Sequence, residues 1–130
     1  EPIRKLGPEK FAEERCPAIL GPGTPAMVAQ LAMTIMKRVP LKGYCQAVEM
    51  MAQTDFFAYA PKIDCPSLVM GGDADPVVSV ESCRRAREAL GDGPIEIIEG
   101  AGHLAGMENP AAFNAAIGRF LATVDGRVAH

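Results

Sequence analysis

Long apolar runs and basic clusters are both missing from this 130-residue sequence. A membrane-spanning helix needs about 20 consecutive apolar residues, and no stretch approaches that length, so we expect no membrane association. The formal net charge is −3, and no Lys/Arg cluster is interleaved with aromatic residues, which argues against a nucleic-acid partner. Residues 1–5 (EPIRK) precede no apolar stretch, so no signal peptide is expected there either.

Cysteine pairs at metal-binding spacing are missing as well. The four cysteines, Cys16, Cys45, Cys65 and Cys83, form no C-x-x-C motif, and His103 has no cysteine near it. We therefore expect four free thiols in a reducing compartment, the cytoplasm, and neither a metal nor another cofactor. A catalytic cysteine is the weaker alternative, because three of the four lie in helical patterns.

The sequence does contain enough apolar material for a folded core. Apolar residues make up 48% and charged residues 22%, which is typical of a globular chain of one-domain size. The pattern changes near residue 62, from helical periodicity to short apolar runs that alternate with helices. We expect a helical segment over 1–61, followed by an α/β segment over 62–130, with no internal repeat.

Helices are predicted in the first segment over about 8–16, 25–38 and 41–53, followed by a short aromatic segment at 55–59. Thr24 is expected to cap the second helix, with Pro25 in its first turn. The apolar stripe of that helix consists of Met27, Leu31, Ile35 and Met36. Five of the seven methionines lie in the second and third helices, which fits either an adaptable apolar wall over a substrate or ordinary helix packing. We favour ordinary packing, with a lid as the functional alternative.

Two short apolar runs, 67–70 and 95–98, flank a helical pattern at 80–90 in the second segment. Strand, helix and strand in this order predict a parallel βαβ unit. A last helix is expected over 110–123, capped by Asn109, and the tail from 125 to 130 is expected to fray. Three arginines of the crossover helix are interpreted as a solvated face: Arg84, Arg85 and Arg87.

Each predicted strand ends in a glycine-containing loop that carries a residue suited to proton chemistry. The loop GGDADP offers Asp75, with Asp73 as a rival, and the loop GAGH offers His103. Because the carboxyl ends of parallel strands share one edge of a sheet, we expect the acid and the histidine to meet there. An acid that fixes the tautomer of a histidine is two thirds of an acyl-transfer triad.

Other roles for these residues stay open. Asp73 and Asp75 can be turn residues that bond local backbone amides, or they can hold a divalent cation together with His103. A lone histidine is more often structural, and the second histidine, His130, is the last residue. Glu108 is expected to cap the last helix rather than to line a site.

The sequence from Gly43 to Val124 resembles the C-terminal part of an α/β-hydrolase. The resemblance is carried by GGDADPVV and EGAGHLAGMENPAAFNAAIGRFL, in which G-x-x-D-P and G-x-G-H follow in the family's order. This ending, together with GYCQAVEMMAQTDF, is most similar to the 3-oxoadipate enol-lactonase branch. The resemblance implies the C-terminal portion of an α/β-hydrolase fold, a helical cap followed by β-α-β-α with parallel strands. It gives Asp75 the acid role and His103 the base role.

A nucleophile is missing from this pattern. The sequence has no G-x-S-x-G elbow, no HGG-type oxyanion loop, and only three serines: Ser67, Ser79 and Ser82. We therefore expect a hydrolase of small-molecule esters or lactones to which this chain supplies the acid and the histidine. A complementing N-terminal half would bring the serine, and a homo-oligomer is the other expected assembly. The alternative is a non-catalytic module that self-associates or binds a partner through an open sheet edge.

Overall fold

The computed structural model describes residues 2–128, with side chains for residues 2–126, so His130 lies outside the described residues. In its N-terminal part, helices α1 (Pro2–Ile19), α2 (Ala26–Lys37), α3 (Leu41–Gln53) and α4 (Phe56–Tyr59) lead into the 3₁₀ helix η1 (Ala60–Lys62). The rest consists of β1 (Val69–Gly72), α5 (Val80–Ala89), β2 (Ile95–Ile98), α6 (Ala105–Glu108) and α7 (Pro110–Val128). In residues 2–128, no helix has the length and apolar character needed to cross a membrane.

Helix α1 is longer than predicted at both ends. Gly7 kinks it with a φ of 77° and a ψ of 163°, and the regular helix resumes at Pro8, where the prediction placed its start. The predicted end near Cys16 is wrong, because the helix continues through Pro17 to Ile19. The carbonyl group of Ile19, which has no intrahelical donor at the helix end, accepts a tertiary hydrogen bond from the amide of His103 at 2.8 Å.

Helices α2 and α3 lie where the sequence predicts them, but the expected cap of α2 is wrong. Pro25 occupies the N-cap position without a side-chain hydrogen bond. The hydroxyl group of Thr24 instead donates to the carbonyl oxygen of Gly21 at 2.7 Å or to a carboxylate oxygen of Glu108 at 2.6 Å. The Thr24 side chain, which the local sequence predicts to cap α2, therefore makes its hydrogen bonds elsewhere in the chain.

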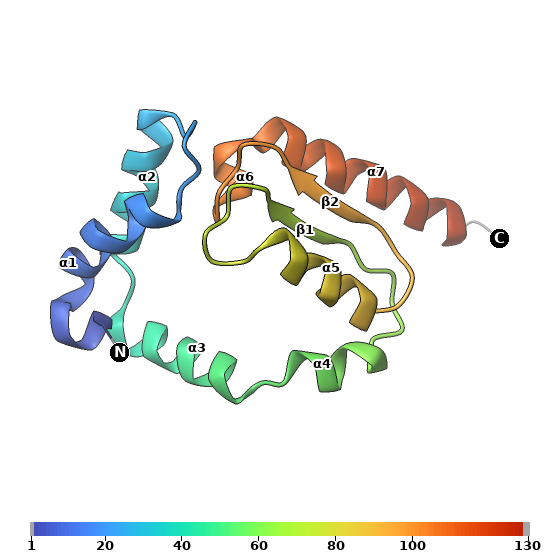
Figure 1. Cartoon of the computed structure of the whole chain (residues 1–130), viewed down its shortest axis with the longest axis horizontal. Helices are drawn as coiled ribbons and strands as arrows, with labels where there is room; N and C mark the ends of the chain where they lie inside the picture. The colour runs from blue at the N-terminus through green and yellow to red at the C-terminus, as the bar shows by residue number, and fades with distance from the viewer. Residues whose placement is uncertain (1, 129–130) are drawn as a thin grey trace.

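The helical part has a core of its own. Ile3, Phe11 and Cys45 are buried together, and Figure 1 shows α1 beside both α2 and α3. The methionines of α2 and α3 do not all join this core. Met27 is 80% exposed, Met51 is 70% exposed, and Met50 is exposed as well, so the prediction of ordinary packing is wrong for these three. This part of the chain therefore carries a large apolar surface that it does not bury itself.

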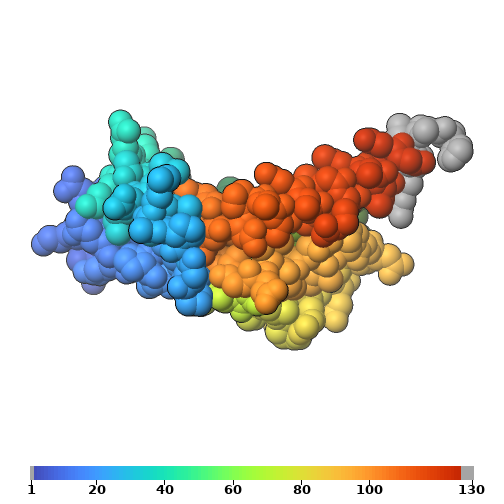
Figure 2. Space-filling model, turned by 90° about the horizontal axis from the view of Figure 1, so that it is seen from above, coloured from blue at the N-terminus to red at the C-terminus, as the bar shows by residue number. Residues whose placement is uncertain are grey.

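The second core lies around a parallel βαβ unit, as predicted. β1 and β2 are parallel and in register from Val69 opposite Ile95 to Gly72 opposite Ile98, with β1 two residues later than predicted. Figure 2, seen from above, shows the orange-red atoms of α7 and the yellow atoms of α5 on opposite sides of this part of the molecule. On the α5 side, a Cβ atom at Gly71 would lie only 2.6 Å from Sγ of Cys83, so glycine allows close helix–strand packing there.

Two helix predictions in this part need correction. Helix α7 continues to Val128 instead of ending at 123, so the fraying expected from 125 is wrong up to 128, and residues 129–130 lie outside the description. Arg87 does not belong to a solvated face, because it is only 7% exposed. Its Nη1 donates to the carbonyl of Ser67 at 2.8 Å and its Nε to that of Gly91 at 3.1 Å. Arg87 thereby joins α5 to the segment that enters β1.

Candidate active site

The two predicted site residues meet at the carboxyl ends of the strands. Figure 1 shows both strands pointing toward α6 and toward the loop between α1 and α2. Asp75 follows β1 in a turn in which its amide donates to the carbonyl of Gly72 at 3.4 Å. His103 follows β2 in a loop that begins at Gly100, whose φ of 69° favours glycine. Nδ1 of His103 lies 2.9 Å from Oδ2 of Asp75.

The other oxygen of Asp75 is fixed by backbone amides. Oδ1 accepts hydrogen bonds from the amides of Val77 at 2.7 Å and Val78 at 3.0 Å. The side chain is only 6% exposed, and that burial acts to raise the pKa of the carboxyl group. The hydrogen bonds from His103 and from the two amides act in the opposite direction and outweigh it, so the pKa of Asp75 is lowered. Asp75 is therefore held as a carboxylate, the form that accepts the imidazole N–H.

This pairing fixes which nitrogen of His103 is free to take a proton. A carboxylate has only acceptors, so Nδ1 of the neutral imidazole must carry the hydrogen and Nε2 is left with its lone pair. The His103 side chain is 38% exposed, so it is more open to solvent than its partner. A buried carboxylate that bonds to a partly exposed histidine is an arrangement in which the histidine can act as a general base.

A hollow of about 410 Å³ adjoins the pair. Asp75 and His103 line it together with mostly apolar residues, among them Met70, Met107 and Phe113. No serine, threonine or cysteine lies among the described residues that line it. The hollow therefore has room for a reacting group beside the histidine, but this chain places no nucleophile there.

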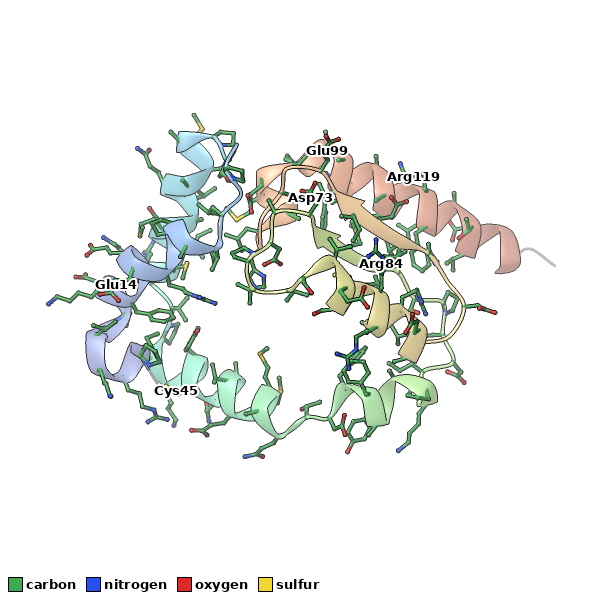
Figure 3. All side chains as sticks on the ribbon, viewed as in Figure 1. Glu14, Cys45, Asp73, Arg84, Glu99 and Arg119 are labelled. Carbon is green, nitrogen blue, oxygen red and sulfur yellow. The ribbon has the colours of Figure 1, made fainter. Side chains whose placement is uncertain are left out.

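Asp73 does not compete with Asp75 for the histidine. Its Oδ1 accepts a hydrogen bond from the amide of Gly100 at 2.7 Å, so it holds the turn that follows β2. Figure 3 labels Asp73 near Glu99, at the same end of the strands. In the described part of the chain, no three His, Cys, Asp or Glu side chains form a group that can hold a metal ion. The alternative of a cation bound by Asp73, Asp75 and His103 is therefore wrong.

Close backbone contacts fix the histidine loop from both sides. A Cβ atom at Gly72 would overlap the carbonyl group of Ala101, which belongs to the loop. A Cβ atom at Gly102 would overlap the amide nitrogen of Gly21 and lie 2.6 Å from the carbonyl oxygen of Ile19. Glycine is thus required at 72 and 102 by close approach, although neither has a positive φ.

Glu108 occupies a different place from the one predicted. It does not cap α7, since Oδ1 of Asn109 accepts the hydrogen bond from the amide of Ala112 at 3.2 Å. Its carboxylate instead joins the histidine loop to the turn that precedes α2, through Gly102 and Thr24 among others. Sequence reasoning missed this contact because Glu108 and Thr24 are separated by 84 residues and no local pattern links them.

The parallel βαβ unit, its covering helices and the acid–histidine pair at the strand ends define an α/β-hydrolase fold, of which this chain holds a part. A family model described as TAP-like protein matches residues 30–128. The chain belongs to this family of α/β-hydrolases.

Curated relatives and solved structures agree with that assignment. The chain is 28% identical to 3-oxoadipate enol-lactonase 2 of Acinetobacter baylyi over 119 residues, which cover 88% of this chain and 44% of the relative. It is also 28% identical to 3-oxoadipate enol-lactonase 1 of the same organism over 86 residues, 66% of this chain and 32% of the relative. The chain therefore spans less than half the length of these relatives.

Two solved structures have the same fold. A thermophilic esterase from Thermogutta terrifontis superimposes with a TM-score of 0.85 at 26% identity, over 95% of this chain and 47% of that one. A bromoperoxidase from Bacillus anthracis superimposes with a TM-score of 0.77 at 22% identity, over 88% of this chain and 44% of that one. The chain thus corresponds to part of an α/β-hydrolase.

Proposed function

We propose that this chain supplies the acid and the histidine of a Ser-His-Asp hydrolase that acts on small-molecule esters or lactones. The observation that carries the proposal is the 2.9 Å hydrogen bond between His103 and Asp75 beside an open hollow. In this mechanism Nε2 of His103 takes the proton of a serine hydroxyl as the serine attacks the carbonyl carbon, and returns it to the leaving oxygen. His103 then activates water in the same way to release the acid product.

Asp75 has a supporting part in this reaction. It keeps Nδ1 of His103 protonated, and it stabilises the imidazolium that forms after each proton transfer. Its lowered pKa supports this role, because the carboxylate stays charged throughout the cycle. The serine and the oxyanion donors would come from a complementing N-terminal half, which would carry the G-x-S-x-G elbow. No metal and no other cofactor enters the mechanism.

The relatives support an ester or lactone as the substrate. Two of them are named 3-oxoadipate enol-lactonase, and one of the similar structures is an esterase. The residues 1–61 would form a helical cap over the substrate, and residues 62–130 the C-terminal part of the catalytic core. The four free cysteines fit a reducing compartment, so we place the protein in the cytoplasm.

Complementation tests this proposal. The chain alone should not hydrolyse a p-nitrophenyl ester, whereas the complemented protein, in which it is joined to or co-expressed with a G-x-S-x-G-containing half, should do so. His103→Ala should abolish this turnover. Asp92→Asn is the control, because Asp92 precedes β2 and lies at the opposite end of the strands from the site. Full activity of the His103→Ala protein would defeat the assignment.

A second candidate is a non-catalytic module that self-associates or binds a partner. The supporting observation is that, within residues 2–128, β1 pairs with β2 along one edge and with no strand along the other, which leaves an open sheet edge. The exposed methionines of α2 and α3 would add apolar contact area. Sedimentation analysis distinguishes the two. Strong self-association without any activity on complementation would favour this module.

A further inference from the structure

The side chain of Glu108 accepts hydrogen bonds from three backbone amides and can accept a fourth from the Thr24 hydroxyl, whose other acceptor is Gly21; these donors come from two distant parts of the chain. Oε1 accepts from the amide of Leu104 at 2.9 Å, and Oε2 accepts from that of Gly102 at 3.0 Å. These two amides flank His103 on both sides. Oε2 also accepts from the amide of Gly21 at 2.7 Å and from the hydroxyl of Thr24 at 2.6 Å. The carboxylate thus joins the histidine loop to the turn between α1 and α2.

Only an ionised carboxylate can accept all four of these bonds. Two carboxylate oxygens offer about four lone-pair sites, whereas a glutamine has one oxygen, and its NH₂ group would face at least one of the donors. Burial acts to raise the pKa of Glu108, but the bonds from Thr24 and the three amides outweigh it, so its pKa is lowered. The group is therefore charged at neutral pH, and it satisfies donors that would otherwise be left without partners in a partly buried place.

The backbone of His103 contacts the end of α1, next to the same turn. Its amide donates to the carbonyl oxygen of Ile19 at 2.8 Å, and Gly102 approaches Gly21 without room for a Cβ atom. In contrast, the His103 ring has one hydrogen-bond partner among the residues that the structure describes, Oδ2 of Asp75. The position of the ring is thus set by its backbone, and the backbone is set by Glu108 and by residues 19–24.

We propose that Glu108 is a positioning residue for His103, through which the turn of residues 21–24 holds the imidazole against Asp75. The helical segment then does more than cover the site, because its contacts determine the position of the His103 imidazole. Only the catalytic consequence rests on the proposed function; the positioning itself is a property of this chain.

Nuclear magnetic resonance of the whole chain tests the positioning without any turnover. The readouts are the downfield Nδ1–H resonance of His103 and the exchange rates of the amides of Gly102 and Leu104 with solvent. Glu108→Gln should abolish the resonance and speed exchange of at least one of these two amides, the one that then faces the NH₂ group, by about tenfold or more, the effect of one lost hydrogen bond or a little over. Glu99→Gln, which makes the same charge change at an exposed neighbour, should leave both readouts as in the wild type.

Thr24 offers a matched pair that leaves the carboxylate in place. Thr24→Val removes the hydroxyl at nearly constant shape, and Thr24→Ser retains it. Thr24→Val should weaken the Nδ1–H resonance and speed amide exchange, whereas Thr24→Ser should behave as the wild type. These two variants test whether the contact between Glu108 and residues 21–24 positions His103, even if Glu108→Gln does not fold. An unchanged Nδ1–H resonance in Thr24→Val, or in a folded Glu108→Gln, would overturn the proposal, because Glu108 would then pin the loop without orienting the ring.

The outcome can be separated from that of the proposed function. Asp75→Asn should remove the Nδ1–H resonance while the amides of Gly102 and Leu104 stay protected, since it does not touch their acceptor. In the complemented protein, Thr24→Val should lower kcat by about tenfold with KM unchanged, and Thr24→Ser should restore it. Lack of hydrolysis by every complemented protein would count against the proposed function, whereas an unchanged resonance would count against the role of Glu108.

Discussion

Nδ1 of His103 lies 2.9 Å from Oδ2 of Asp75, although 28 residues separate them in the chain. The two parallel strands bring them together, because each residue follows the carboxyl end of its strand. The side chain of Asp75 is almost fully buried, whereas that of His103 is partly exposed. Both side chains line the hollow, so the charged group and the proton acceptor lie side by side there. This relationship underlies the catalytic proposal and the first prediction.

Replacement of Asp75 by asparagine should reduce the turnover of the complemented protein strongly. Asparagine can present its NH₂ group to Nδ1 and so favour the tautomer in which Nε2 carries the hydrogen and cannot act as a base. We expect kcat for a p-nitrophenyl ester to fall by about 10²–10⁴-fold, the usual contribution of acid–base catalysis. Asp92→Asn, the same exchange at the opposite end of the strands, should leave kcat within about twofold of the wild type. A mild effect of Asp75→Asn would show that the acid is dispensable.

The stability of the chain should fall on acidification, and Glu108 should be one cause. The pKa of Glu108 is lowered in the folded state, so its contribution is complete above the ordinary glutamate value of 4.5. It is lost as the pH falls through the lower value of the folded state, because the unfolded chain takes up the proton first. Urea unfolding between pH 7 and pH 3 should therefore give a flatter pH dependence for Glu108→Gln than for the wild type. Parallel curves would contradict this origin of the acid sensitivity.

Two glycines of the histidine loop should not tolerate alanine. A Cβ atom at Gly72 or Gly102 would overlap backbone atoms, which cannot move away as a flexible side chain can. We expect each alanine variant to lose about 2–4 kcal/mol of unfolding free energy, measured by urea denaturation. Gly43→Ala is the control, because Gly43 is exposed within α3 and a Cβ atom there meets nothing within 4 Å. That exchange should stabilise the chain by about 0.4–1 kcal/mol.

Arg87 and Arg84 should respond differently to the same replacement. Arg87→Met leaves the partly buried hydrogen bonds to the carbonyl groups of Ser67 and Gly91 without their donor, at a cost of about 1–3 kcal/mol. Arg84 is exposed and lies 3.6 Å from a carboxylate oxygen of Glu81, a surface pair worth about 0–0.5 kcal/mol. Thermal and urea unfolding of both methionine variants measure the contrast. Equal losses would show that the buried guanidinium group does not stabilise the join between α5 and β1.

The sequence predictions were correct where an element depends on interactions between residues close in the chain, and they failed where it depends on residues far apart. Helix α5 begins at residue 80, as the helical pattern predicts, and the Ser79 side chain caps it by accepting a hydrogen bond from the amide of Ser82 three residues later. Strand β2 and helix α3 also match, since apolar periodicity and flanking glycine or proline define them locally. Thr24, by contrast, shows every local sign of a helix cap and yet bonds to Glu108.

The sequence by itself determined the order of strands and helices, the parallel βαβ unit, and the candidate pair Asp75 and His103, because these depend on local patterns and on where parallel strands end. Only the tertiary structure decided that Arg87 is buried, that the methionines of α2 and α3 stay exposed, and that Glu108 joins two loops. The physical reason is that burial and hydrogen-bond partners depend on which segments become neighbours in space. Residues 21–24 and 102–108 are such neighbours, and the sequence of neither stretch indicates that the two are in contact.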